Sequence, residues 1–154
     1  MSFLRKLPWL ALLAAFVVIL AVACGDDDDD GNGSGDGGTG GSIAVLLPDS
    51  ASSDRWENDD RRFLSEAFDA AGVEYSIVNA NGDARQQQTQ AEQAITNGAT
   101  VLLMVNLDSG SGNAIIENAR AQGVIVIDYD RLTIEGPGAY FYVSFDNESV
   151  GRLQ

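Results

Sequence analysis

The sequence has 154 residues, enough for one domain, and carries a net charge of −14 at pH 7. So negative a surface argues against nucleic acid as a partner, because it would repel the phosphate backbone. The chain contains no His and one Cys, which excludes a His-dependent catalytic triad, a His-ligated zinc site and an internal disulfide. We therefore expect neither a metal nor a cofactor.

The start of the chain is expected to direct export. Arg5 and Lys6 precede an uncharged apolar run over residues 7–24 that ends in small residues, which predicts a signal peptide over residues 1–23. The run ends in LAVAC, which resembles the lipobox of bacterial lipoproteins, and this resemblance implies that Cys24 is the lipidated first residue of the mature chain. The alternative is an uncleaved membrane anchor, for which this length is marginal. Both readings place the rest of the chain outside the cytoplasm.

Residues 24–42 are rich in Asp and Gly, and no apolar side chain follows Cys24 in this segment. It cannot bury enough surface to offset the entropy of ordering, so it predicts a disordered tether. Partial matches to an EF-hand loop and to G-x-G-x-x-G occur within it. The first lacks flanking helices and the second lacks a preceding strand, so neither predicts ion or phosphate binding.

The remainder of the chain alternates apolar runs with segments of helical spacing. Strands are predicted for five runs: residues 43–47, 73–78, 100–105, 124–128 and 140–145. Strand, helix and strand follow one another roughly every 25–30 residues, which is the βαβ rhythm. Because most of these strands are continuously apolar, they predict a parallel sheet with helices on both faces.

The first helix is predicted to begin after Asp54, with Glu57 completing a capping box, and to end at Gly72. Its expected apolar stripe consists of Phe63, Leu64, Ala67, Phe68 and Ala71. Nearby, Arg61 and Arg62 are expected to be solvated. Two further helices are predicted between residues 83 and 98 and between residues 109 and 123.

A last helix is predicted after the fifth strand, with Asp146 or Asn147 as its N-cap. The chain stops at Gln154 inside that helix. We therefore expect this chain to be a fragment, which alone would bind a ligand weakly.

Ligands of parallel α/β sheets bind beyond the carboxyl ends of the strands. The segments that follow four of the predicted strands bring these side chains to that edge: Asp49, Arg55, Trp56, Asn106, Asp108, Asp128, Tyr129, Asp130, Arg131, Asp146 and Asn147. Carboxylate, amide and guanidinium groups suit vicinal hydroxyls, with strong hydrogen bonds. No Gly-rich loop follows the first strand, which disfavours a nucleotide. Within the set, Asp128 and Tyr129 are expected to pack rather than to contact a ligand.

Four motifs resemble the type I periplasmic sugar-binding proteins, most closely the D-xylose-binding proteins of ABC importers. They are DRWENDDRRF from Asp54, NANGD from Asn79, IDYDRL from Ile127 and VSFDNESVG from Val143. The resemblance implies a flavodoxin-like fold in which residues 43–154 form the N-terminal sugar-binding lobe of a two-lobed protein. The first loop departs from the family, with Pro48 before a single Asp49, which leaves the identity of the sugar open.

The resemblance also implies a ligand site. Asp130 and Arg131 match the family pair that hydrogen-bonds the sugar, Arg55 and Trp56 match the Arg-Trp at the start of the first helix, and Asn147 falls in the Asp-Asn motif after the fifth strand. Structural alternatives remain open: an ion pair between Asp130 and Arg131 at the rim, a Trp56 that only covers the sheet edge, and an Asn147 that only caps a helix.

The expected function follows from this resemblance. It implies an extracytoplasmic solute-binding lipoprotein, anchored by lipid to the outer face of the bacterial cell membrane or periplasmic. Such a protein captures a monosaccharide, here a xylose-like pentose, and passes it to ABC permease subunits without catalytic residues. The alternatives are a sugar-sensing protein that presents its ligand to a chemoreceptor or sensor kinase, and a carboxylate-dependent glycoside enzyme. A repressor's sugar-sensing domain would instead need an N-terminal DNA-binding motif, where this chain has an apolar run.

Overall fold

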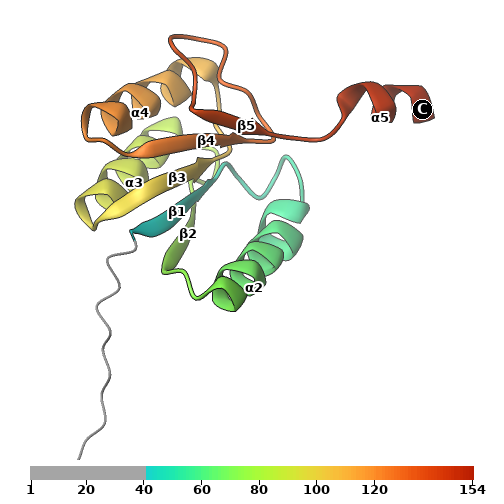
Figure 1. The fold of residues 1–154 in the computed structure, drawn as a ribbon. Coiled ribbons are helices and arrows are strands. Elements are labelled where there is room, and N and C mark those ends of the chain that lie inside the picture. Colours follow the sequence, from blue (N-terminus) through green and yellow to red (C-terminus); the bar gives the residue numbers. More distant parts are fainter. Residues whose placement is uncertain (1–40) are drawn as a thin grey trace, which may run out of the picture. The chain divides into compact units, whose positions relative to one another are not determined.

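The computed structural model describes residues 41–154, and the predicted signal peptide, Cys24 and the tether up to residue 40 lie outside that range. Five parallel strands form one sheet in the order β2-β1-β3-β4-β5 (Figure 1). The strands are β1 (Ser42–Leu47), β2 (Tyr75–Asn79), β3 (Ala99–Met104), β4 (Ile125–Tyr129) and β5 (Phe141–Val143). This is the flavodoxin-like strand order, which confirms the predicted fold class.

Helices cover both faces of the sheet, as predicted (Figure 1). They are a π-helical turn η1 (Trp56–Asp60), α2 (Arg61–Ala71), α3 (Ala84–Thr96), α4 (Ser109–Ala121) and α5 (Asn147–Leu153). Ala44 and Leu46 of β1 belong to the core beneath α3 and α4, whereas Val45 and Leu47 belong to the core beneath η1 and α2. Successive residues of a strand point to opposite faces, so one apolar run serves both cores.

Asp side chains cap the starts of α3 and α4, and a Gly ends α2. The Asp83 carboxylate accepts hydrogen bonds from the backbone N–H groups of Arg85 and Gln86 at the start of α3. Asp108 accepts one from Ser111 in α4. These acceptors satisfy N–H groups that have no partner within the helix. Gly72 has a φ of 64° and ends α2, as predicted.

The predicted capping box at Asp54 and Glu57 is wrong. The helical segment begins with Arg55 in the cap position, without a side-chain cap, and the Asp54 carbonyl accepts from the backbone N–H of Asn58. Glu57 turns to other partners: Arg61 Nε lies 2.6 Å and Asn79 Nδ2 lies 2.5 Å from its carboxylate oxygens. These two bonds tie η1 to α2 and to the end of β2. The i,i+4 spacing of Glu57 and Arg61 is a local pattern, whereas no local pattern reveals the bond to Asn79.

The predicted apolar stripe of α2 is only partly correct. Leu64 and Phe68 pack against the core, but Ala67 and Ala71 are exposed, and Phe63 is 55% exposed under the guanidinium of Arg62, 4.0 Å from its ring centre. Both arginines next to this stripe were expected to be solvated. Arg62 is exposed, but Arg61 is half-buried and donates to the Ile77 carbonyl at 2.8 Å.

The last strand and helix are less embedded than the others. β5 covers only half of the run predicted for it, and its three side chains are exposed at the edge of the sheet. α5 extends away from the sheet beyond the end of β5 (Figure 1), and its N-cap is Asp146, which accepts from the backbone N–H of Ser149. Within residues 41–154, no helix combines the length and the hydropathy needed to cross a bilayer.

Candidate functional site

Four of the five predicted ligand residues meet where β1 and β4 end. Trp56 lies at their centre, with the guanidinium of Arg55 4.1 Å and that of Arg131 5.8 Å from an indole ring centre. A guanidinium at such distances is attracted by the aromatic face. Asp130 joins the group through Arg55, whose Nη2 lies 3.4 Å from its carboxylate. The parallel sheet therefore gathers residues that are 74 or more positions apart in the numbering, as expected for strands whose carboxyl ends share one edge.

The arginines do not pair as the neighbouring positions of Asp130 and Arg131 suggested. Among residues 41–154 there is no ion pair between these two, so the predicted alternative of a rim ion pair is wrong. Arg55 pairs with Asp130 and also, through Nε, with Asp60 at 3.2 Å. Arg131 lies 4.0 Å from Asp49 instead. The two arginines thus pair with different acids, and both guanidinium groups lie beside the indole.

Hydrogen bonds hold Arg131 more firmly than its ion pair does. Its Nη1 donates to the Asn106 carbonyl at 3.2 Å, and its Nη2 donates to Ser52 Oγ at 3.0 Å. The Asn106 side chain in turn donates to the Arg131 carbonyl at 3.0 Å. Loops after β1, β3 and β4 therefore position one guanidinium, which leaves the remaining N–H groups of its five for other acceptors.

The backbone of Asp130 explains how its side chain reaches Arg55. Asp130 has a φ of 66°, in the left-handed region that non-Gly residues adopt uncommonly and Asp tolerates better than most. Its N–H donates to the Val143 carbonyl at 2.8 Å, and its own carbonyl accepts from the Tyr142 hydroxyl at 3.0 Å. The edge strand β5 thus holds the bend at which the chain leaves β4.

Asp128 packs beneath the site, as predicted. Its side chain is fully buried and accepts from the N–H of Thr133 at 2.7 Å and from its hydroxyl at 3.0 Å. The Thr133 hydroxyl also accepts from Asn106 Nδ2 at 2.9 Å. This network fixes the loop after β4 from below, so that Asp130 and Arg131 lie on a rigid base.

Asp128→Asn should lower the free energy of unfolding more at about pH 4 than at about pH 7. Burial raises the pKa of Asp128 in the folded protein. Its contribution to stability is therefore fully present below the ordinary carboxyl pKa of the unfolded chain and is lost as pH rises through the raised native value. Asn does not titrate. Urea denaturation at both pH values measures the difference, with the exposed Asp69→Asn as control, and an equal or larger loss at neutral pH would contradict the expectation.

Trp56 is almost fully buried, whereas an indole that stacks on a sugar ring needs an accessible face. It is 2% exposed, its Nε1 donates to Ser52 Oγ at 3.1 Å, and its ring meets Tyr129 edge-on at 6.5 Å. The indole therefore supports the two guanidinium groups and covers the end of the sheet, which favours the structural alternative. Its contact with a sugar stays a prediction.

Asn147 is not brought to the other four residues. It is the exposed first residue of α5, and the helix is capped by Asp146 instead. A role as a helix cap is therefore wrong for Asn147, and a ligand role stays a prediction.

Sequence reasoning missed Ser52, Asp60 and Phe145. Asp60 is half-buried on η1 against Arg55, and burial raises the pKa of its carboxyl. The Arg55 guanidinium lies 5.0 Å from the ring centre of Phe145.

The sequence did contain one signal for Ser52, because the pattern D-x-x-S follows three of the strands: Asp49–Ser52, Asp108–Ser111 and Asp146–Ser149. In each, the carboxylate accepts from the backbone N–H and from the hydroxyl of the Ser, and the pKa of the Asp is lowered by these bonds.

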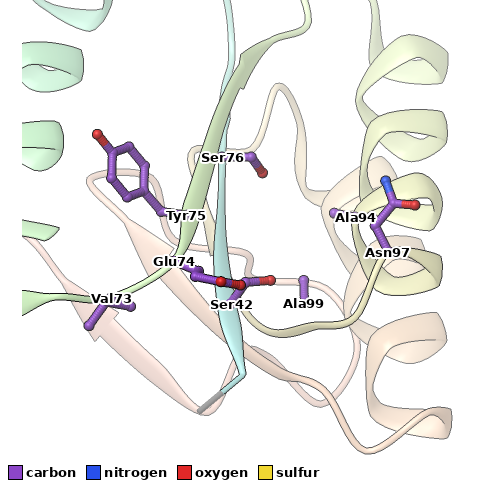
Figure 2. Close-up of a pocket in the computed structure, with 8 residues that line it drawn as sticks. All are labelled: Ser42, Val73, Glu74, Tyr75, Ser76, Ala94, Asn97 and Ala99. Atoms are coloured by element: carbon purple, nitrogen blue, oxygen red, sulfur yellow. The ribbon is translucent and has the colours of Figure 1, made fainter. Parts of the chain in front are cut away.

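Two further features bear on what this part of the chain can bind. Among residues 41–154 there is no group of three or more acidic or Cys side chains that could hold a metal ion. A cavity of about 440 Å³ lies at the opposite end of the sheet, between the starts of β1, β2 and β3 and the end of α3 (Figure 2). Figure 2 shows Ser76 and Asn97 on one side of β2 and Tyr75 on the other. None of the predicted ligand residues lines this cavity.

Known proteins match this part of the chain. Residues 43–154 match the family model described as a periplasmic binding protein domain. The chain is 33% identical over 106 residues to the D-xylose-binding periplasmic protein of Escherichia coli (strain K12), covering 69% of this chain and 32% of that protein. It is 31% identical over 114 residues to the multiple sugar-binding periplasmic receptor ChvE of Rhizobium radiobacter, covering 74% of this chain and 32% of that protein. A carbohydrate transporter solute binding protein from Chloroflexus aurantiacus, solved in complex with D-glucose, matches with a TM-score of 0.65 and 35% identity, covering 72% and 32%.

The matched region runs from β1 to the end of α5 and includes all five strands. The chain spans about a third of the length of these curated relatives. A family model that covers most of the chain, and a fold shared with a solved solute-binding protein at 35% identity, point to the same conclusion. The chain belongs to the periplasmic binding protein family.

Proposed function

We propose that this chain is part of an extracytoplasmic solute-binding lipoprotein that captures a monosaccharide, a xylose-like pentose, for an ABC importer. The observation that carries the proposal is the meeting of Arg55, Asp130 and Arg131 at the carboxyl edge of a parallel sheet. Relatives whose names record xylose or multiple sugars as ligands support it. The other partners proposed are the permease subunits and the membrane, reached through a lipid anchor at Cys24.

The hydrogen-bonding capacity of the site supports a polyhydroxyl ligand. Arg55 Nη2 is buried and makes no hydrogen bond within the described residues, although Asp130 lies 3.4 Å away. Arg131 has N–H groups beyond the two that it donates to Asn106 and Ser52. Adjacent sugar hydroxyls could accept from these guanidinium groups and donate to the Asp130 carboxylate. Hydrogen bonds to charged groups contribute about 1.5–3 kcal/mol each, enough to hold a neutral ligand.

We propose binding without covalent chemistry. A glycoside hydrolase needs one carboxyl that is protonated near neutral pH to act as general acid. Asp49 does not fit that role, because the Ser52 backbone N–H lowers its pKa. Asp128 does not fit it either, because its carboxyl is fully buried against Thr133. The ligand would instead act by favouring a closed arrangement of two lobes over an open one.

A sensory role is the second candidate, because one relative is named a receptor. The same sugar-bound form could engage a permease or a membrane sensor. Deleting the gene in its natural host distinguishes the import role from the sensory role. Loss of sugar uptake indicates import, whereas intact uptake with loss of sugar-dependent signalling indicates sensing.

Calorimetric titration tests the proposed function. The protein used is the product of the complete natural gene, called the full-length protein below, and the ligands are D-xylose, D-ribose, L-arabinose, D-glucose, D-galactose and myo-inositol. We expect a dissociation constant in the micromolar range or tighter for one pentose. Tightest binding of a hexose would reject the pentose but keep a sugar-binding function. Absence of heat for every ligand, or turnover of a glycoside, would reject the proposal.

Cys24→Ser should leave the precursor uncleaved and without lipid when the full-length protein is produced in a bacterial host. The reason is that lipoprotein processing would need the thiol of Cys24, which is the one Cys of the chain. Mass spectrometry of the membrane fraction, with the parent protein as control, measures cleavage and acylation. A normally cleaved and acylated variant would contradict the assignment.

A further inference from the structure

The hydroxyl of Ser52 connects three side chains of the candidate site. It donates to Asp49 Oδ2 at 2.8 Å, and its oxygen accepts from Trp56 Nε1 at 3.1 Å and from Arg131 Nη2 at 3.0 Å. A hydroxyl has one proton to donate and two lone pairs that accept. All three capacities of Ser52 are therefore used, and two are used by residues predicted to form the ligand site.

The other two D-x-x-S segments show what the motif does without this connection. Ser111 and Ser149 donate their hydroxyls to Asp108 and Asp146 at the starts of α4 and α5. In the described part of the chain, neither of these hydroxyl oxygens accepts a hydrogen bond from another side chain. Helix capping thus accounts for both, whereas Ser52 precedes the helical segment by four residues and receives two additional donors.

The loop that carries Ser52 is held in place from β1. Asp49, which is nearly buried, accepts from the backbone N–H groups of Ala51 and Ser52 as well as from the Ser52 hydroxyl. The contacts with Asp49 therefore hold the hydroxyl in position independently of Arg131. Arg131 comes from the loop after β4, 79 positions later in the sequence.

We propose that Ser52 is a positioning residue for ligand binding, whose hydroxyl sets the orientation of the Arg131 guanidinium and the Trp56 indole. The proposal rests on the proposed function and adds to it the residue that orients the binding groups. Ser52 acts through Arg131 and need not touch the ligand.

Ser52→Ala in the full-length protein tests the proposal with two readouts. We expect sugar affinity to fall by about 10-fold, the effect of one hydrogen bond of ordinary strength. We also expect the Trp56 indole N–H resonance and the Arg131 side-chain N–H resonances to shift in ¹⁵N–¹H NMR spectra, because both lose their acceptor. Trp56→Phe and Arg131→Lys spectra assign these resonances.

Two variants control for general damage to the loop. Ser52→Thr keeps the hydroxyl and should retain affinity and resonances, whereas a loss as large as that of Ser52→Ala would overturn the proposal. Ser50→Ala changes an exposed Ser of the same loop that takes no part in these bonds, and should leave both readouts unchanged. Unchanged affinity in Ser52→Ala would also overturn the proposal, even if the resonances shift. If the parent binds no sugar, the proposed function fails, and unchanged resonances in Ser52→Ala would then overturn the positioning role separately.

Discussion

Arg131→Ala should weaken monosaccharide binding by the full-length protein about 100-fold. Hydrogen bonds from a charged donor contribute about 1.5–3 kcal/mol each, which corresponds to roughly 10- to 150-fold in affinity for one bond. The guanidinium is already oriented by Ser52 and the Asn106 carbonyl, so a ligand would pay little to order it. Asp130→Asn keeps one acceptor oxygen and should cost less. Calorimetric titration measures both losses.

Asp130 and Arg131 are adjacent in the sequence, but the loss would not come from breaking an ion pair between them. Asp130 keeps its partner Arg55 when Arg131 is removed, and the acid that loses its cationic partner is Asp49. Asp49 keeps its bonds from Ser52 and Ala51, so the fold should tolerate the change. Arg62→Ala, on the exposed face of α2, is the matched control and should bind sugar like the parent. If Arg131→Ala binds the sugar with the affinity of the parent protein, the sugar site lies elsewhere.

Trp56→Ala should lower the free energy of unfolding by about 3–5 kcal/mol, the usual cost of deleting a buried large aromatic side chain. Trp56 is 2% exposed and belongs to the core beneath η1 and α2, together with Val45 and Leu47. The cavity left behind would also remove the surface on which Arg55 and Arg131 rest. Urea denaturation of the full-length protein measures the effect.

An exposed aromatic residue provides the comparison for Trp56. Phe63 lies on α2 and is 55% exposed, so Phe63→Ala should cost less than about 1 kcal/mol. Trp56→Phe should lie between the two, because it keeps most of the apolar volume but loses the bond to Ser52. A Trp56→Ala variant as stable as Phe63→Ala would show that the indole is not part of the core.

The fold could be predicted because its central strands, β1 and β3, are covered on both faces. A strand of that kind is apolar along its whole length, so residues 43–47 and 100–105 predicted β1 and β3 to within one residue. β5 was predicted too long. An edge strand hydrogen-bonds to a neighbour on one side only, and Phe145, which lies beyond the end of β5, is exposed. The start of the first helix was predicted to within two residues, but the capping box was wrong because Glu57 bonds instead to Arg61 and to Asn79, which is 22 positions away.

The site could be predicted as a group of residues but not as a set of contacts. Its members share the carboxyl edge of the sheet, and that follows from strand order alone. The pairing of Arg55 with Asp130 depends on the positive φ of Asp130 and on its bond to Val143 in β5. The orientation of Arg131 depends on a hydroxyl in a loop 79 positions earlier. The D-x-x-S pattern marks Ser52 beside Asp49, but no local pattern shows that Ser52 orients Arg131 or that Arg55 pairs with Asp130.

A crystal structure of the full-length protein with its bound monosaccharide tests the central claim most directly. Our account predicts the sugar at the carboxyl edge of this sheet, with its hydroxyls within about 2.6–3.2 Å of the Asp130 carboxylate and of the guanidinium groups of Arg55 and Arg131. The Arg131 guanidinium should still donate to Ser52 in that complex. A sugar bound elsewhere on the protein, with no contact to Asp130 or Arg131, would contradict the account.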